Sequence, residues 1–137
     1  SRQNRRESML RTLLFGLALV ACASAAYTSL AVNVIDQGTG GRPKSGDSVT
    51  VQYTGTLASN GKKFDSSYDR NEPFTFKLGE GQVIPCWDQG VAKMQKGETA
   101  MLHCPANMAY GASGAGGVIP PNADLNFKVQ LLSFKQD

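Results

Sequence analysis

The side chains that could form a functional site in this sequence are aromatic and apolar, with almost no nucleophile or metal ligand near them. They lie between residues 53 and 127, around the only tryptophan of the chain. The set is Tyr53, Phe64, Asp65, Phe74, Phe76, Val83, Ile84, Trp87, Tyr110, Ile119 and Phe127. His103 is the only histidine and no C-x-x-C pattern occurs, so we expect no metal site. The chemistry that remains is chemistry that an apolar pocket can perform by itself.

Length and charge indicate one neutral domain. The chain has 137 residues and a formal net charge of +3, which is enough sequence for one domain with a buried core. Four arginines and Glu7 precede residue 26, and the remainder holds ten basic and ten acidic side chains. A neutral body without a basic stripe argues against nucleic-acid binding. We expect no second domain and, without a dimerisation arm, a monomer.

Residues 1–25 are predicted to form a leader and residues 26–137 the folded domain. Arg11 precedes an apolar run over residues 13–23, and Ala23-Ser24-Ala25 is a small-residue cleavage pattern. This is the organisation of a secretory signal peptide, here Met9–Ala25, preceded by upstream or transit sequence. The expected location is the secretory pathway or a bacterial periplasm. Within the secretory pathway, the protein would reside in the endoplasmic reticulum lumen or be secreted.

Two alternatives to a cleaved leader stay open. Leu19-Val20-Ala21-Cys22 resembles a lipoprotein lipobox, in which Cys22 would be lipidated. The segment could also be an uncleaved anchor, although its apolar run is short for a spanning helix. In either case the domain would sit at a membrane; the lumen of another organelle is a further alternative.

Removal of the leader would leave two cysteines, Cys86 and Cys104. An even pair in an oxidising compartment suggests one disulfide, provided that the two Cα atoms lie within about 7 Å of each other. The alternative is a pair of buried free thiols that pack as small apolar side chains.

Alternation of apolar and polar residues predicts a mainly β domain. Residues 48–54 alternate with period two, and Asn60-Gly61 indicates a hairpin to a strand at residues 63–65. A leading strand and a glycine-rich turn are expected within residues 27–43. Further strands are expected at residues 74–78, 99–104 and 125–134.

One helix and one long loop complete the predicted elements. A helix of two or three turns fits residues 85–95, because Pro85 suits the first turn and Gly97 suits the position just past the end. Residues 106–121 are rich in glycine and proline, and a loop of this length in a small domain is usually functional.

Many short motifs resemble, in order and spacing, those of FKBP-type peptidyl-prolyl cis–trans isomerases. The resemblance covers about residues 34–134 without a large gap. The matching motifs are Tyr53-Thr54-Gly55, Gly61-Lys62-Lys63-Phe64-Asp65-Ser66-Ser67, Arg70-Asn71-Glu72-Pro73-Phe74, Leu78-Gly79, Val83-Ile84-Pro85-Cys86-Trp87, Gly90-Val91, Met94, Gly97-Glu98, Ala109-Tyr110-Gly111-Ala112, Ile119-Pro120-Pro121-Asn122-Ala123 and Leu125-Asn126-Phe127.

The resemblance implies both a fold and an activity. The fold is α+β: an antiparallel sheet of about five strands forms a half-barrel wrapped around one short α-helix. The activity is cis–trans isomerisation of X-Pro bonds in polypeptide clients, without a cofactor. Binding of macrolides such as rapamycin and tacrolimus is also implied.

An apolar pocket is chemically sufficient for this reaction. An X-Pro bond prefers trans only weakly, but amide resonance gives its rotation a barrier of about 20 kcal/mol. A twisted amide carries less charge on its oxygen than a planar one, so transfer from water to an apolar pocket destabilises the ground state more than the transition state. That difference is catalysis by differential binding, and it needs no covalent step.

The resemblance also implies a role for each site residue. Trp87 would form the floor of the pocket, and the walls would be Tyr53, Phe74, Val83, Ile84 and Phe127. Phe64 and Ile119 would form the rim. Asp65 and Tyr110 would orient substrate carbonyls, with the Ile84 backbone N–H as a third donor, and Arg70 would hold Asp65 ionised. The implied catalytic set is Asp65, Tyr110, Trp87, Phe127 and Tyr53.

Spacing alone leaves structural alternatives open. A single tryptophan on a helix is more often a core residue than a pocket floor. Tyr110 could be a buried phenol with a satisfied hydroxyl, and Asp65 could simply cap a turn. Phe76 shares one face of its strand with Phe74 and is expected in the core, and His103 is expected to be a strand residue without a functional role.

Two segments depart from the family pattern. Ala115-Gly116-Gly117 stands where many members carry a bulkier side chain, and Val118 is smaller than the isoleucine often found there. We expect a mobile loop tip with fewer contacts to a macrolide or partner. Pro85-Cys86 replaces the charged residue and glycine that commonly precede the tryptophan, so a disulfide would tie the helix start to the strand ending at Cys104.

Three functions remain open on the sequence. The first is an active isomerase for secreted or luminal clients. The second is a binding module that uses the same pocket or the loop of residues 106–121 to hold a partner. The third is a redox-regulated or membrane-tethered adaptor that depends on Cys86 and Cys104, or on Cys22.

Overall fold

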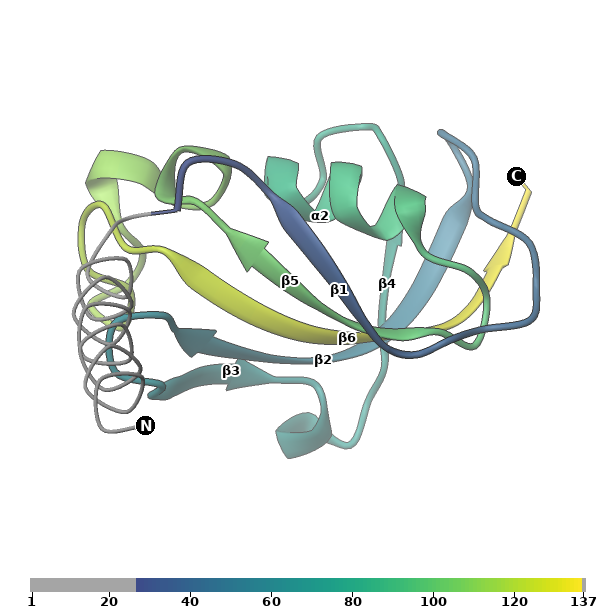
Figure 1. Ribbon diagram of the computed structural model, residues 1–137, viewed down its shortest axis with the longest axis horizontal. Helices are drawn as coiled ribbons and strands as arrows, with labels where there is room; N and C mark the ends of the chain where they lie inside the picture. Colours follow the sequence, from purple (N-terminus) through teal and green to yellow (C-terminus); the bar gives the residue numbers. More distant parts are fainter. Residues whose placement is uncertain (1–26, 137) are drawn as a thin grey trace, which may run out of the picture.

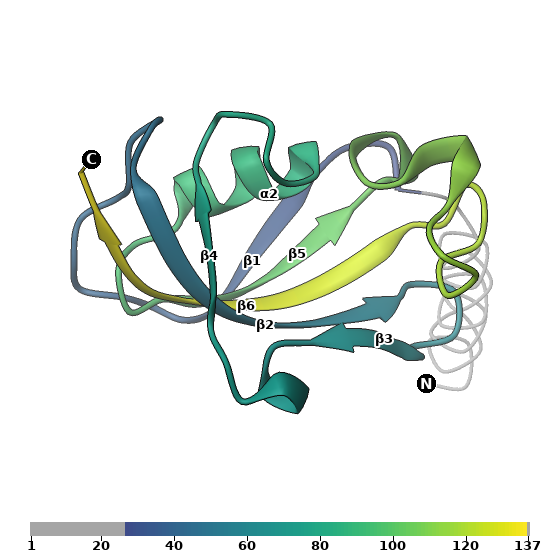
Figure 2. The same ribbon diagram turned by 180° about the vertical axis from the view of Figure 1, so that it is seen from behind.

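The computed structural model describes residues 27–136. Figures 1 and 2 show a strongly curved sheet with one helix lying across its concave side. The predicted leader, its cleavage site, the lipobox and the alternative anchor all lie outside the described residues. Within the described part, no helix is long and apolar enough to cross a bilayer.

The sheet has six antiparallel strands and is not closed. Its order is β1-β5-β6-β2-β3, and β4 also pairs with β2. The strands are β1 Ala31–Asp36, β2 Ser48–Leu57, β3 Lys63–Ser66, β4 Phe74–Lys77, β5 Thr99–Cys104 and β6 Leu125–Lys135. The implied antiparallel sheet around one short helix is confirmed, and it has six strands where the resemblance implied about five. β2 pairs with β4 along its first half and with β3 along its second.

The period-two pattern of β2 is confirmed over its whole length. Buried and partly exposed residues alternate strictly from Ser48 to Leu57, so the strand extends three residues beyond the predicted end at residue 54. The Asn60-Gly61 hairpin is also confirmed. Gly61 has φ +73°, the region that favours glycine, and the Lys62 N–H donates to Asn60 Oδ1 at 2.8 Å.

The helix is shorter than predicted. α2 covers Pro85–Gly90, and the 3₁₀ turn η2, Val91–Lys93, continues it. Helical structure therefore stops two residues before residue 95. Met94 turns to an extended conformation, with φ −87° and ψ 154°, and its side chain is fully buried in the core. Gly90 sets the contact with β5, because a Cβ on Gly90 would lie 3.0 Å from Leu102.

The segment predicted as a long loop contains local structure. It holds two 3₁₀ turns, η3 Ala106–Met108 and η4 Gly111–Ser113. A further turn is closed by a β-bridge between Ala115 and Ile119. Two backbone hydrogen bonds join these residues, Ala115 N–H to Ile119 O at 2.9 Å and Ile119 N–H to Ala115 O at 3.0 Å.

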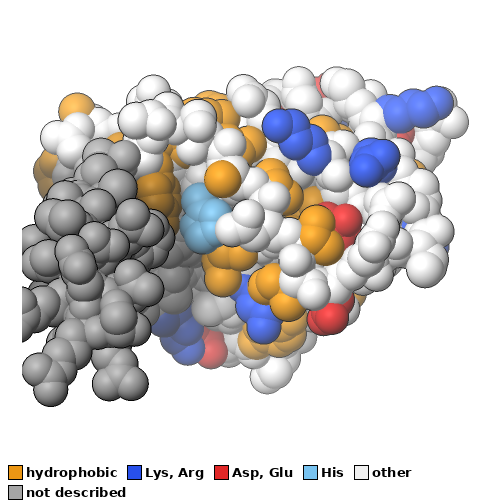
Figure 3. Space-filling model, in the orientation of Figure 1, with side chains coloured by type: hydrophobic (Ala, Val, Ile, Leu, Met, Phe, Trp, Pro, Cys, Tyr) orange, Lys and Arg blue, Asp and Glu red, His pale blue; other side chains and the backbone are white. Residues whose placement is uncertain are grey.

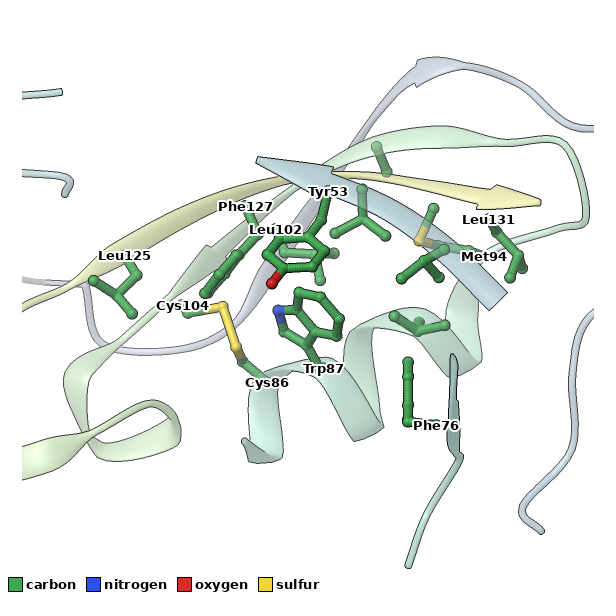
Figure 4. Packing of buried hydrophobic residues seen from close by; sticks show 14 of the residues in the cluster. Tyr53, Phe76, Cys86, Trp87, Met94, Leu102, Cys104, Leu125, Phe127 and Leu131 are labelled. Atoms are coloured by element: carbon green, nitrogen blue, oxygen red, sulfur yellow. A yellow bond between two sulfur atoms is a disulfide. The ribbon is translucent and has the colours of Figure 1, made fainter. Parts of the chain in front are cut away.

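The core lies between the concave face of the sheet and α2 (Figure 4). Phe76 is 3% exposed, which confirms the prediction that it belongs to the core. The fully buried members come from several elements of the fold. They are Val49, Val51, Cys86, Val91, Met94, Ala100, Leu102, Cys104, Leu125, Val129 and Leu131.

His103 lies on the outer face of the sheet (Figure 3). Its Nδ1 lies 2.8 Å from Asn126 Oδ1, and its Nε2 lies 2.9 Å from Asn33 Nδ2. The Tyr27 hydroxyl donates to the same Asn126 oxygen at 2.8 Å. These contacts attach the first described residues to β5 and β6, on the opposite face of the sheet from α2.

Cys86 and Cys104 form a disulfide (Figure 4). Both side chains are fully buried, and their Cα atoms are 5.7 Å apart, within the range that a disulfide requires. Cys86 is the second residue of α2 and Cys104 is the last of β5. The bridge therefore joins the start of the helix to the strand that leads into the segment carrying Tyr110.

We predict that reduction of this disulfide lowers the free energy of unfolding by about 3 kcal/mol, because the unfolded chain regains the freedom of an 18-residue loop. Urea unfolding with and without dithiothreitol measures the difference. A Cys86→Ala/Cys104→Ala variant is the control, since its midpoint should not respond to dithiothreitol. Equal midpoints for the unsubstituted protein in both conditions would contradict the prediction.

Candidate functional site

A pocket of about 350 Å³ opens beside the start of α2. Residues from β2, β3, β4, β6, the connection from β4 to α2, α2 itself and the segment after η3 line it. They are Tyr53, Phe64, Asp65, Phe74, Gln82, Val83, Ile84, Trp87, Tyr110 and Phe127. Nine of the eleven residues to which the family resemblance gives a site role are among them.

Trp87 lies at the centre of the aromatic side chains and is 4% exposed. The centroid of its ring system lies 4.8 Å from the Tyr53 ring, 5.3 Å from Phe127 and 5.8 Å from Phe74. All three contacts are edge-to-face, with interplanar angles of 72–88°, an arrangement that aromatic rings favour. Trp87 is thus both a core residue and a lining residue of the pocket, and the two roles do not exclude each other.

Gly55 allows two walls of the pocket to approach each other. A Cβ on Gly55 would lie 2.6 Å from Phe64 and 2.8 Å from Phe127. Those two rings are in edge-to-face contact with centroids 5.6 Å apart. The sequence showed Gly55 only as part of a motif, because steric clearance between distant aromatic rings leaves no periodic signal.

Gln82 is a lining residue that the sequence analysis missed. Its Oε1 accepts a hydrogen bond from the Lys77 backbone N–H at 2.9 Å. Asp88 of α2 holds the same connection, because its carboxylate accepts from the N–H groups of Gly79 and Gly81 at 2.9 and 3.2 Å. A polar residue inside a glycine-rich turn carries no signal of its own, and only the folded connection brings Gln82 to the site.

Asp65, Tyr53 and Arg70 form one hydrogen-bonded network at the edge of the pocket. The Tyr53 hydroxyl donates to Asp65 Oδ2 at 2.5 Å and accepts from Arg70 Nη2 at 2.7 Å. Arg70 Nη1 donates to Asp65 Oδ1 at 2.5 Å, and the Ser66 N–H donates to the same oxygen at 2.8 Å. Arg70 therefore lies outside the lining and fixes two residues that belong to it.

The network sets the protonation states of the site. Burial raises the pKa of the Asp65 carboxyl, but hydrogen bonds from Tyr53 and Arg70 outweigh burial and hold this pKa below its ordinary value. Burial and the hydrogen bond to Asp65 raise the pKa of Tyr53. Burial, and then the charge of Asp65, raise the pKa of Tyr110. At neutral pH Asp65 is ionised and both phenols are neutral.

The lowered pKa of Asp65 agrees with the expectation that Arg70 holds this carboxyl ionised, and the ionised state limits how it can orient a carbonyl. A carboxylate only accepts hydrogen bonds, so it cannot donate to a substrate carbonyl oxygen. The other two donors that the resemblance implies are the Tyr110 hydroxyl and the Ile84 backbone N–H, and both residues line the pocket. Trp87 also lines it, and its buried indole N–H has no hydrogen-bond partner among the described residues. Tyr110 is 40% exposed, so its hydroxyl is accessible rather than a buried, internally satisfied phenol.

Ile119 is the other site residue that the structure places outside the pocket. It is 6% exposed and belongs to the core cluster. It lines a neighbouring groove instead of the rim of the first pocket. The β-bridge with Ala115 turns it inward, a contact that the spacing of the loop sequence does not encode.

Comparison with known proteins agrees with this geometry. The family model of the FKBP-type peptidyl-prolyl cis-trans isomerase matches residues 40–132. The chain is 56% identical over 104 residues to FK506-binding protein 1 of Dictyostelium discoideum. The aligned residues cover 76% of this chain and 96% of that protein.

Two further relatives are similar over a comparable length of this chain. Peptidyl-prolyl cis-trans isomerase Fkbp12 of Drosophila melanogaster is 57% identical over 90 residues, or 66% of this chain and 82% of that protein. FK506-binding protein 2 of Candida glabrata is 59% identical over 92 residues, which are 67% of this chain and 68% of that protein. With this match and the aromatic pocket over α2, the chain belongs to the family of FKBP-type peptidyl-prolyl cis–trans isomerases.

Proposed function

We propose that this protein isomerises X-Pro bonds of polypeptide clients by binding the prolyl ring against Trp87. The observation that carries the proposal is the combination of a buried aromatic floor and a lining without a nucleophile–base pair. Asp65, the only carboxylate of the lining, is held ionised by Tyr53 and Arg70. Its hydrogen-bond partners fix it in place, so it is not set up to transfer a proton.

The apolar walls favour the twisted amide over the planar one. The oxygen of a planar X-Pro amide carries a large partial charge and loses favourable hydration when it enters the pocket. The oxygen of the twisted amide carries less charge and therefore loses less hydration free energy. Tyr53, Phe74 and Phe127 surround Trp87 with rings in edge-to-face contact, and the ring edges carry only a weak positive potential. The difference in solvation lowers the barrier without a covalent intermediate.

The polar groups of the site must avoid stabilising the ground state. A strong donor on the rotating carbonyl would favour the planar amide, which carries more charge on its oxygen. The Ile84 N–H therefore assists catalysis best if it binds a carbonyl that does not rotate. The nearest such group is the carbonyl of the proline itself, because Ile84 immediately precedes α2 and Trp87 lies under the ring.

Asp65 acts by its charge. Loss of resonance leaves the carbonyl carbon of a twisted amide more positive, and a fixed carboxylate beside the pocket favours that state. The hydroxyl of Tyr110, on the neighbouring segment, holds a carbonyl of the client chain. The residues that accelerate rotation are in this account Trp87, Phe127, Tyr53, Asp65 and Tyr110.

The same pocket accommodates macrolides such as rapamycin and tacrolimus. Two of the similar proteins carry FK506 binding in their names, and the aromatic floor and walls of this chain supply the corresponding apolar surface. The loop tip supplies less contact surface, because Gly116 and Gly117 have no side chains. No atom lies within 4 Å of the positions that a Cβ on either residue would occupy. Macrolide binding should therefore depend on the floor more than on the loop.

The predicted leader and the disulfide support a location in the secretory pathway or a bacterial periplasm. A cleaved signal peptide would deliver residues 26–137 to an oxidising space, in which the Cys86–Cys104 bridge is stable. Retention of the leader or lipidation of Cys22 would tether the same domain to a membrane. The default assembly is a monomer that acts on exposed X-Pro bonds.

We predict that the purified protein accelerates isomerisation of a short peptide with a Leu-Pro-Phe sequence, and that rapamycin abolishes the acceleration. The reason is that both ligands require the surface above Trp87. A protease-free fluorescence assay measures the rate, with circular dichroism as the check on folding. A folded protein without acceleration would mean that the pocket is only a binding surface.

We predict that Tyr110→Phe lowers kcat/KM about threefold to tenfold, the effect of one hydrogen bond of ordinary strength. Tyr68→Phe is the matched control, because Tyr68 is 53% exposed and does not line the pocket; its kcat/KM should not change. Equal rates for Tyr110→Phe and the unsubstituted protein would show that the Tyr110 hydroxyl does not contribute to the reaction.

We predict that the mature protein from its native host begins at Ala26. N-terminal peptide mass spectrometry measures the position, because cleavage after Ala25 leaves a defined end. An N-terminus upstream of residue 9 would contradict cleavage, and a lipid-modified Cys22 would assign the chain to the lipoprotein alternative.

A further inference from the structure

A second cavity adjoins the aromatic pocket and shares Phe64 with it. It is a groove of about 580 Å³ between the β2–β3 hairpin and the loop that precedes β6. Figures 1 and 2 both show these two segments side by side at one end of the molecule. Its lining is Leu57, Asn60, Lys62, Lys63, Phe64, Ser113, Ala115, Gly116, Gly117, Val118, Ile119, Pro120 and Pro121.

Phe64 connects the groove to the aromatic pocket, since its side chain lines both. A peptide whose proline occupies the pocket continues in both chain directions and must leave across two parts of the rim. If the proline carbonyl binds the Ile84 N–H, the chain that follows the proline leaves on the side of residues 82–84. The chain that precedes the proline then leaves past Phe64 and enters the groove.

The groove has room for an extended backbone along its loop side. Gly116 and Gly117 have φ values of +52° and +74° and leave open space where a Cβ would project. Val118 is 57% exposed. A backbone can therefore approach this side closely, with Val118 and the adjoining prolines as an apolar contact for its side chains.

The hairpin side of the groove is positively charged. Lys62 and Lys63 both line it, and no carboxylate does. Lys63 forms a salt bridge with Asp69 at 2.9 Å, in which both side chains are more than half exposed. Lys62 has no such partner among the described residues, so its charge is uncompensated at the groove.

We propose that this groove is an extended client subsite, which holds the residues that precede the X-Pro bond and prefers an acidic side chain among them through Lys62. The proposal rests on the proposed isomerase function and deepens it. The aromatic pocket selects the proline, and the groove selects the sequence before it. Clients with Asp or Glu two to four residues before the proline would be isomerised preferentially.

Peptides that differ in one charge test the proposal. The series is Glu-Ala-Leu-Pro-Phe, the same peptide with Gln or Lys in place of Glu, and Ala-Leu-Pro-Phe-Glu, all with blocked termini. At low salt we expect kcat/KM to be about twofold to fivefold higher for Glu than for Gln before the proline, as for an exposed ion pair. The Lys peptide should be slower than the Gln peptide, and 0.5 M NaCl should remove the differences.

Lys62→Glu should reverse the order of the Glu and Lys peptides. The control is Lys44→Glu, which makes the same change at an exposed lysine in the β1–β2 connection, at the other end of the molecule (Figure 1). It should keep the original preference. Both positions are exposed, and the circular dichroism spectra of the two variants should match that of the unsubstituted protein.

Equal rates for the Glu and Gln peptides at low salt would overturn the proposal, and so would a preference that persists in Lys62→Glu. A gain only for the peptide with Glu after the proline would overturn the assigned chain direction. Dissociation constants of the same peptides, from the fluorescence of the single tryptophan, give a readout without catalysis. If every peptide binds without being isomerised, the isomerase function fails, whereas a Lys62-dependent preference in binding would still support the subsite.

Discussion

The position of Trp87 is the constraint on which the other features of this domain depend. Its ring system lies across the concave side of the sheet and contacts Tyr53, Phe74, Phe76 and Phe127, with ring centroids 4.8–5.8 Å away. One face of this cluster is core and the other is pocket. A change in the orientation of α2 would therefore alter packing and binding together, since the same ring serves both.

Two features hold α2 in that position, one on each side of the tryptophan. The Cys86–Cys104 disulfide joins the helix start to β5, and Gly90 permits close packing against Leu102 of the same strand. The rim is fixed separately by the hydrogen bonds among Tyr53, Asp65 and Arg70. The apolar floor and the charged edge have separate functions. The floor excludes water from the bound amide, and the edge holds the Asp65 carboxylate in a fixed position beside it.

The sequence predicted most of the fold, because the strands of this domain alternate with period two and the hairpin at Asn60-Gly61 has a specific local signature. It overestimated the helix, because Met94 leaves helical geometry to reach the core, and that depends on the sheet. The motif matches placed Tyr53, Asp65 and Trp87 in the pocket lining. They did not show that Ile119 turns inward, that Gln82 lines the pocket or that Gly55 provides clearance for two rings. Each of these depends on contacts between elements distant in the chain.

The central claim is that the pocket works by desolvation and fixed charge, without proton transfer. The most direct test is the pH profile of kcat/KM between pH 5.5 and 9, measured in H₂O and in D₂O. Because the pKa of Asp65 is lowered and those of Tyr53 and Tyr110 are raised, none of the three groups changes protonation in that window. We predict a flat profile and a solvent isotope effect close to one. A bell-shaped profile, or an isotope effect of about two or more, would show general acid–base catalysis and contradict the account.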